Sequence, residues 1–390
     1  MDSHALGRTG ISISEFIFGA GAIGGIGSSP ATRGHGLTPD EGYARLDEAD
    51  ALGITAIDTA DAYGGGESER TVGRWLAERQ PAGPLVCTKV GSIVRADGTG
   101  GVDLSPAHIE RQLAQSAGRL GRVDLYLSHV PDPGTPVQQT LEAFTRARAT
   151  GKIRAYGVCN VSAAILDEIL ATADRAGLDR PGWVQNRLSL LARQDEQDVL
   201  PLAAAEGLGY TPFSPLAGGV LSDRYLDGAP ATPGSRIAVA GDRYYPGMHT
   251  QANLDRVAAL REVARRHTVS VSGLALAWLR SHPLVTAPIV SPSKAAQWQA
   301  VREALTLDLA EDERAEISAI FSLGRRAGHV AEPGRSRPER DACRVPKLGG
   351  RTNRTARPER VHLLQTWREE PARGRVRRRV SEGDSPNSVL

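Results

Sequence analysis

The sequence has only three cysteines, Cys87, Cys159 and Cys343, and none of them belongs to a C-x-x-C pair. This spacing suggests neither a disulfide framework nor a zinc site, so we expect no bound metal and a reducing compartment. The chain also lacks any run of about 18 apolar residues, so no membrane-spanning helix is expected. The first residues show no basic segment followed by an apolar one, so we recognise no secretory signal. These absences predict a cytoplasmic protein.

The chain has little excess charge of either sign, because 47 Lys and Arg residues are balanced by 45 Asp and Glu residues. The distribution is uneven: residues 331–390 hold 15 basic and 8 acidic side chains, which leaves 32 and 37 for residues 1–330. Such a basic tail can bind nucleic acid or an acidic partner, or it can be an extension without a binding role, and we favour the second. Residues 324–390 are rich in Arg, Pro and Gly with few aliphatic residues, which predicts disorder.

Apolar segments rich in β-formers alternate with amphipathic segments through residues 1–323. Strands are expected at 16–18, 54–57, 85–88, 124–128, 153–158, 184–186, 209–213 and 285–289. Helices are expected at 38–52, 67–78, 105–120, 136–150, 162–176, 197–206, 270–281 and 294–305. Strands that alternate with helices pair in parallel through right-handed crossovers, and eight such units match a closed barrel better than an open sheet. The sequence therefore predicts the α/β class and a (β/α)8 barrel over residues 1–323.

Two segments fall outside this alternation. Residues 6–13 contain a turn at Arg8-Thr9-Gly10 and are expected to form a short β-hairpin that closes the bottom of the barrel. Residues 226–248 are rich in Gly and Pro without an apolar period, which predicts a long loop.

A literal G-x-G-x-x-G at Gly19 to Gly24 follows the first predicted strand. Its function in dinucleotide-binding folds requires a helix that begins at the second glycine, so that the helix N-terminus meets the diphosphate. The next residues, 25–30, contain two more glycines and a proline, and no helix can start there. We therefore reject a doubly wound fold and expect these glycines to let a loop pass close to a ligand.

Polar side chains stand at the ends of three consecutive predicted strands. Asp58 and Tyr63 follow the second strand, Lys89 ends the third, and His129 follows the fourth. Barrel enzymes carry their chemistry at the C-terminal ends of the strands, so we expect these residues on one rim. There, the Lys89 ammonium would lower the pKa of the Tyr63 phenol, and Asp58 would pair with Lys89. His129 would orient a carbonyl oxygen by a hydrogen bond, and Asp61 is expected at the surface.

At these positions the sequence resembles the aldo-keto reductase superfamily, which has D-T-A-x-x-Y-G after the second strand, T-K after the third and H after the fourth. Further similar motifs follow in the same order at residues 6–10, 157–160, 184–186 and 213–219, and the resemblance extends from about residue 6 to 321. It implies a barrel that binds NADP(H), with NAD(H) as the alternative, in an extended form. It also implies a catalytic tetrad of Asp58, Tyr63, Lys89 and His129, with Tyr63 as general acid and base.

The resemblance implies a set of residues around the cofactor as well. Cys159, Asn160 and Gln185 would hold the nicotinamide amide, and Phe213 would stack on the nicotinamide ring. The diphosphate would lie along Ser214, Leu216, Gly218, Arg224 and Arg236, and the adenosine end along Ser291, Ser293, Lys294 and Gln297, with Gly21, Asp58 and Pro215 also in the cofactor site.

The sequence departs from the family pattern at three places. Cys159 stands where a serine is usual, and a thiol is the weaker hydrogen-bonding group. Ala300 and Val301 stand where an acidic residue and Asn often follow the adenosine motif, while Lys294 favours a cofactor with the additional phosphate. Small residues end the first strand in place of a larger side chain, which predicts a wide substrate pocket.

Two functions of different classes follow from this reading. The first is an NADP(H)-dependent oxidoreductase that reduces aldehyde or ketone groups of small or sugar-like substrates, or oxidises the corresponding alcohols with the same residues. The second is a nicotinamide-binding regulatory subunit that resembles the β subunits of potassium channels. Steady turnover of NADPH with a panel of carbonyl compounds distinguishes the two.

Overall fold

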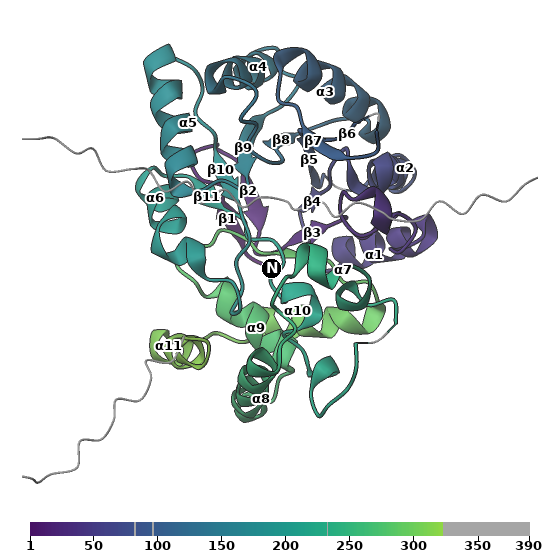
Figure 1. The fold of residues 1–390 in the computed structure, drawn as a ribbon, viewed down its shortest axis with the longest axis vertical. Helices are drawn as coiled ribbons and strands as arrows, with labels where there is room; N and C mark the ends of the chain where they lie inside the picture. Colours follow the sequence, from purple (N-terminus) through teal and green to yellow (C-terminus); the bar gives the residue numbers. More distant parts are fainter. Residues whose placement is uncertain (82, 96, 232, 323–390) are drawn as a thin grey trace, which may run out of the picture. The chain divides into compact units, whose positions relative to one another are not determined.

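Eight parallel strands form the centre of the molecule in this computed structural model, which describes residues 1–81, 83–95, 97–231 and 233–322. They are hydrogen-bonded in the order β11-β10-β9-β8-β5-β4-β3-β12. Backbone hydrogen bonds from Thr286 N to Tyr210 O and from Ile289 N to Pro212 O, both 2.8 Å, join the two ends of this order. The predicted (β/α)8 barrel is confirmed, and Figure 1 shows its strands surrounded by helices. The predicted tail at 324–390 lies outside the described residues.

The barrel strands are short and the helices between them are longer. The strands are β3 (Ile17–Gly19), β4 (Ala56–Asp58), β5 (Leu85–Val90), β8 (Leu125–Ser128), β9 (Ala155–Cys159), β10 (Trp183–Gln185), β11 (Gly209–Tyr210) and β12 (Ile289–Val290). The helices are α1 (Pro39–Ala51), α2 (Glu67–Arg79), α3 (Pro106–Leu120), α4 (Val137–Ala149), α5 (Ala163–Ala176), α6 (Val199–Ala205), α9 (Val271–Arg280) and α10 (Trp298–Thr306). All were expected from the sequence, with boundaries that differ by a few residues.

One prediction about the connections is wrong. The segment predicted as a long loop at 226–248 contains a helix, α7 (Arg236–Tyr244), whose first turn is capped by the Ser235 hydroxyl. Its backbone departs from helical angles at Ala240, and the glycines around it hid its short amphipathic pattern. Elements that the sequence analysis did not name are α8 (Gln251–Arg266), α11 (Glu311–Ile320) and an antiparallel pair, β6 (Ser92–Val94) and β7 (Gly100–Val102).

The bottom of the barrel is covered by the predicted hairpin, which is confirmed as β1 (Ser3–Ala5) paired with β2 (Ser12–Ser14). Leu6 and Ile13, at its inner side, are each only 1% exposed and pack with barrel residues such as Leu125 and Trp183. The N-terminal hairpin therefore seals the end of the barrel opposite to the C-terminal ends of the strands.

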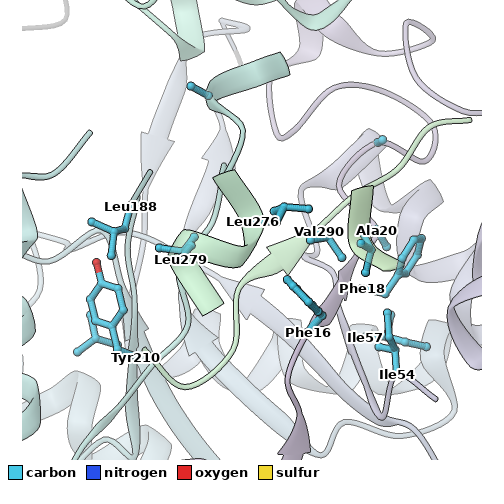
Figure 2. Packing of buried hydrophobic residues seen from close by; sticks show 14 of the residues in the cluster. Phe16, Phe18, Ala20, Ile54, Ile57, Leu188, Tyr210, Leu276, Leu279 and Val290 are labelled. Atoms are coloured by element: carbon cyan, nitrogen blue, oxygen red, sulfur yellow. The ribbon is translucent and has the colours of Figure 1, made fainter. Parts of the chain in front are cut away.

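Strand side chains point alternately into the barrel and toward the helices. Outward residues such as Phe18 and Ile57 form the large core between strands and helices. Figure 2 shows part of this core, with Leu276 and Leu279 of α9 between Tyr210 on one side and Phe16, Phe18 and Val290 on the other. Inward residues fill the barrel itself. The Trp183 ring lies so close to Gly157 on the neighbouring strand that a Cβ atom there would be 2.6 Å from the ring, so a side chain does not fit at this position.

In the part of the chain that the structure describes, no helix has the length and apolar character needed to cross a bilayer.

Candidate active site

The interior of the barrel changes from apolar to polar within two residues on several strands. Ala56 is followed two positions later by Asp58, Cys87 by Lys89, Leu127 by His129 and Trp183 by Gln185. Residues two apart in a strand face the same side, so the second member of each pair also lies inside the barrel, nearer the C-terminal rim. We call Ala56, Cys87, Leu127 and Trp183, together with Leu125 two residues below Leu127, the lower layer. Asp58, Lys89, His129 and Gln185 form the upper layer.

The structure brings the four predicted catalytic residues together at this rim. Lys89 Nζ donates hydrogen bonds to Asp58 Oδ1 at 2.5 Å and to Tyr63 Oη at 3.3 Å. The His129 ring stands edge-on to the Tyr63 ring, with 5.5 Å between ring centroids. Asp58, Lys89 and His129 are buried, whereas Tyr63 is half-buried and can reach a bound molecule.

The net effect on the Tyr63 phenol is opposite to the expected one. Burial raises the pKa of Tyr63 to about 12, although the Lys89 ammonium lowers it as predicted. Loss of hydration penalises the phenolate more than one ammonium at 3.3 Å stabilises it. The hydroxyl is therefore protonated at neutral pH, which is the form needed to donate a proton.

The neighbours of Tyr63 have well-defined charge states. Burial disfavours the Lys89 ammonium, but Asp58 and Tyr63 outweigh it and hold the pKa of Lys89 above its usual value. Burial and the Lys89 charge lower the pKa of His129 to about 3, so its imidazole is neutral. The His129 Nδ1 atom is buried without a hydrogen-bond partner among the described residues. A neutral imidazole can donate one hydrogen bond to a substrate oxygen without adding charge.

Gln185 makes a contact that the sequence analysis did not anticipate. Its Nε2 atom donates a 2.8 Å hydrogen bond to Asp58 Oδ2, so both oxygens of this carboxylate are bonded, one to Lys89 and one to Gln185. The other predicted nicotinamide-amide residues adjoin the same group. Cys159 Sγ lies 3.8 Å from Gln185 Oε1, and Asn160 Nδ2 donates to the His129 backbone oxygen at 2.9 Å.

Phe213 and Ser214 follow β11 and lie beside two residues that the sequence analysis missed. The guanidinium carbon of Arg187 is 5.7 Å from the Phe213 ring centroid and 5.4 Å from that of Tyr245. Tyr245 Oη is 3.4 Å from Ser214 Oγ. The inward alternation of Trp183 and Gln185 was a signal that could have identified Arg187.

Two further residues predicted near the diphosphate also adjoin this group. Arg236 donates to Ser291 Oγ at 3.3 Å, which joins a predicted diphosphate residue to a predicted adenosine residue. A Cβ atom at Gly218 would lie 2.8 Å from the Tyr245 ring, so only glycine fits there. Of the others, Leu216 is half-buried, Pro215 is buried, and Arg224 is exposed beside Tyr225.

The predicted adenosine residues near α10 form a turn of their own. Gln297 Oε1 accepts hydrogen bonds from Ser293 N at 2.7 Å and from Lys294 N at 3.1 Å. Ser293 and Lys294 are exposed, and the Ser293 hydroxyl also donates to Gln297 Oε1 at 3.1 Å, so Gln297 shapes the turn.

The glycine-rich segment after β3 runs as a loop, as expected, and contacts both Tyr63 and α7. A Cβ atom at Gly21 would lie 3.2 Å from Cε2 of Tyr63, so the missing side chain leaves room for the phenol. Further along, the Ser29 backbone N–H donates a 3.0 Å hydrogen bond to Tyr244 Oη, which attaches this loop to α7.

Asp61 is not the surface residue that was expected. Its Oδ1 atom is buried without a partner among the described residues, although the residue as a whole is partly exposed. Burial, followed by the nearby Glu69 carboxylate, raises the pKa of Asp61 to about 8. Glu69 is itself fully buried and bonded to Arg119 and Thr88, each at 2.6 Å.

Comparisons with known proteins show the family and the fold of the chain. The model of the Aldo/keto reductase family matches residues 16–321. The chain is similar to a protein described as a voltage-gated potassium channel β subunit from Schizosaccharomyces pombe, with 33% identity over 75% of this chain and 84% of that protein. It is also similar to the L-glyceraldehyde 3-phosphate reductase of Escherichia coli O157:H7, with 31% identity over 75% of this chain and 86% of that protein. Among solved structures, the glycerol dehydrogenase of Gluconobacter oxydans has the same fold, with a TM-score of 0.70, 24% identity, and coverage of 86% of this chain and 99% of that one.

Proposed function

The chain belongs to the aldo/keto reductase family, and we propose that it transfers hydride between NADP(H) and a small or sugar-like carbonyl compound, with Tyr63 as general acid and base. Membership of this family makes the protein an oxidoreductase that acts on carbonyl or alcohol groups. The cofactor, its preference for the phosphorylated form and the role of each residue are the parts that we propose.

The residues at the rim fit a nicotinamide dinucleotide. The half-buried Phe213 offers an aromatic face, and Cys159, Asn160 and Gln185 present polar atoms suited to an amide. Arg236, beside Ser291, offers a cation for a phosphate. When bound there, the nicotinamide supplies or accepts the hydride.

The chain's own residues handle the proton. In reduction, Tyr63 Oη gives its proton to the substrate oxygen, and the Lys89 ammonium at 3.3 Å stabilises the phenolate that forms. Asp58 holds Lys89 in place and keeps it charged. The neutral His129 orients the substrate oxygen, and in oxidation of an alcohol the same steps run in reverse.

The observation that supports this proposal most is the position of Lys89 Nζ between Asp58 and Tyr63. An ammonium that is fully buried is costly unless it is paired, and here it is paired on one side and bonded to a half-exposed phenol on the other. That arrangement serves proton exchange at Tyr63 better than it serves stability.

Tyr63→Phe tests the role of the phenol. General acid and base catalysis typically contributes about 10²–10⁴-fold, so kcat should fall by about that factor while NADPH still quenches protein fluorescence as in the wild type. Tyr126→Phe is the matched control, because Tyr126 is a buried tyrosine on the outer side of the sheet. Unchanged kcat in Tyr63→Phe would refute the role given to this residue.

A regulatory, nicotinamide-binding subunit is the second candidate, supported by the similarity to the protein described as a potassium channel β subunit. The similarity to a glyceraldehyde 3-phosphate reductase favours catalysis instead. A panel of aldehydes, ketones and aldoses with NADPH and NADH decides between them: many turnovers per site support the enzyme, whereas a single turnover or none supports the regulatory subunit.

A further inference from the structure

Arg187 occupies the inner side of the rim next to the predicted catalytic residues. The extended backbone of β10 continues through it, as its parallel bridge to Phe213 shows. It therefore shares a face with Trp183 and Gln185, and stands about 7 Å beyond Gln185 along the strand direction. Gln185 is bonded to Asp58, so Arg187 stands next in line, toward the rim, to a residue that contacts the tetrad.

The Arg187 guanidinium is packed among aromatic rings and not against a carboxylate. It lies over the rings of Phe213 and Tyr245 and takes part in no ion pair within the described part of the chain. Two other largely buried arginines differ: Arg119 pairs with Glu69 and Arg280 pairs with Glu15, each at 2.6 Å. Arg187 is thus half-buried, and no carboxylate among the described side chains pairs with its positive charge.

Hydrogen-bonding groups surround this charge. Tyr245 Oη and Ser214 Oγ are 3.4 Å apart and lie beside the ring that Arg187 covers. Burial raises the pKa of the Tyr245 phenol, yet Arg236, Ser214 and Arg187 together bring it below its ordinary value. This part of the rim is therefore a region of positive potential that contains hydroxyl donors.

We propose that Arg187, with the hydroxyl of Tyr245, binds the phosphate group of a phosphorylated aldehyde or ketone substrate. A phosphate has three strong acceptor oxygens and prefers a guanidinium fork to other cations. The position favours the substrate over the phosphates of the cofactor, because Arg187 lies over Phe213 at the predicted nicotinamide end of the site, whereas Arg236 bonds Ser291, a predicted adenosine residue. This inference rests on the proposed function and specifies its substrate class.

The test compares two substrates that share a carbonyl, glyceraldehyde 3-phosphate and glyceraldehyde, in the wild type and in Arg187→Gln. We expect kcat/KM for the phosphorylated substrate to fall by about 10–100-fold, the usual worth of a hydrogen bond to a charged group, with little change for glyceraldehyde and for the Kd of NADPH. Arg187→Lys should restore part of the loss. Arg243→Gln, on the exposed side of α7, is the control and should change neither substrate.

Two results would overturn the inference. An equal fall for both substrates would make Arg187 a packing residue for Phe213, and a weaker Kd for NADPH with unchanged substrate discrimination would assign it to the cofactor. If the wild type turns over neither substrate nor any other carbonyl compound of the panel, the proposed function fails by itself. Calorimetric binding of glyceraldehyde 3-phosphate to the NADPH-loaded protein, lost in Arg187→Gln, would then still support this site.

Discussion

The lower and upper layers of the barrel interior are built by the same strands, two residues apart, yet they differ in chemistry. The lower layer, with Ala56, Cys87, Leu125 and Trp183, is apolar and sealed from below by the N-terminal hairpin. The upper layer contains a buried carboxylate, ammonium, imidazole and amide, and opens toward the C-terminal ends of the strands. The difference shows that the barrel separates the residues that stabilise it from those proposed to react.

The separation also explains how the upper layer acquires its charge states. Apolar side chains lie below Asp58 and Lys89 and limit the hydration of these groups from that side. Burial raises the pKa of Tyr63 and lowers that of His129. The lower layer therefore contributes to the chemistry indirectly, by excluding water beneath the charged pair.

The largest effect is expected from Lys89→Met, which leaves the Asp58 carboxylate buried without its cation. Removing one partner of a buried ion pair costs about 3–5 kcal/mol of unfolding free energy, and kcat should fall by about 10²–10⁴-fold. Urea unfolding and steady-state kinetics measure the two effects. The double variant Asp58→Asn/Lys89→Met should regain much of the stability and none of the turnover. Recovery of both would mean that the pair is structural.

Leu125→Ala tests the lower layer alone. The cavity left by the substitution should reduce the unfolding free energy by about 2–5 kcal/mol, because Leu125 is 3% exposed and belongs to the apolar core inside the barrel. We expect kcat per folded molecule to stay close to the wild-type value, since the substitution removes no polar group. A large loss of kcat at full folding would show that the two layers are not separable.

Gln185→Leu tests the link from Gln185 to Asp58. Loss of the hydrogen bond to Asp58 Oδ2 leaves a charged acceptor unsatisfied, at a cost of about 1–3 kcal/mol, so kcat should fall by about tenfold. Stopped-flow measurement of the Kd for NADPH separates this effect from cofactor binding. If the Kd rises while kcat is unchanged, Gln185 contacts the cofactor only and does not support Asp58.

The smallest effect on kcat is expected at Asp61, just beyond the upper layer, where the prediction concerns the pH dependence of stability. Its pKa of about 8 exceeds that of an unfolded Asp, so between about pH 4 and pH 8 the folded chain binds more protons than the unfolded chain. The unfolding free energy should therefore decrease as the pH rises through this window, and Asp61→Asn should remove most of that decrease. Thermal unfolding at a series of pH values checks this, with the exposed Asp97→Asn as control. Parallel pH curves for wild type and Asp61→Asn would contradict it.

Much of the fold was predictable because its signals are local. Alternating strands and helices gave the barrel, and polar residues at strand ends placed Asp58, Lys89 and His129 on one rim. The helix α7 was missed because its segment contains Gly234 and Gly241 and has no long apolar period. Propensity and spacing do not reveal a short helix that is held by tertiary contacts.

The details of the site were less predictable because they depend on three-dimensional packing. The direction of the Tyr63 pKa depends on how burial compares with one ammonium, and the sequence gives no measure of burial. The same holds for Asp61, which was expected at the surface. The contacts of Gln185 with Asp58 and of Arg187 with Tyr245 join residues from different strands and loops, which only the structure brings into register.

The attachment of α7 to the loop after β3 has a consequence for sequence variation. The donor is the backbone N–H of Ser29, so any residue except proline can supply it, whereas the acceptor is the Tyr244 hydroxyl alone. The next residue, Tyr245, covers Gly218 and faces Ser214 and Arg187. Substitutions at position 29 should thus be tolerated among related chains. Tyr244 and Tyr245 should vary less, because a substitution that moves the backbone at one of them also moves the other.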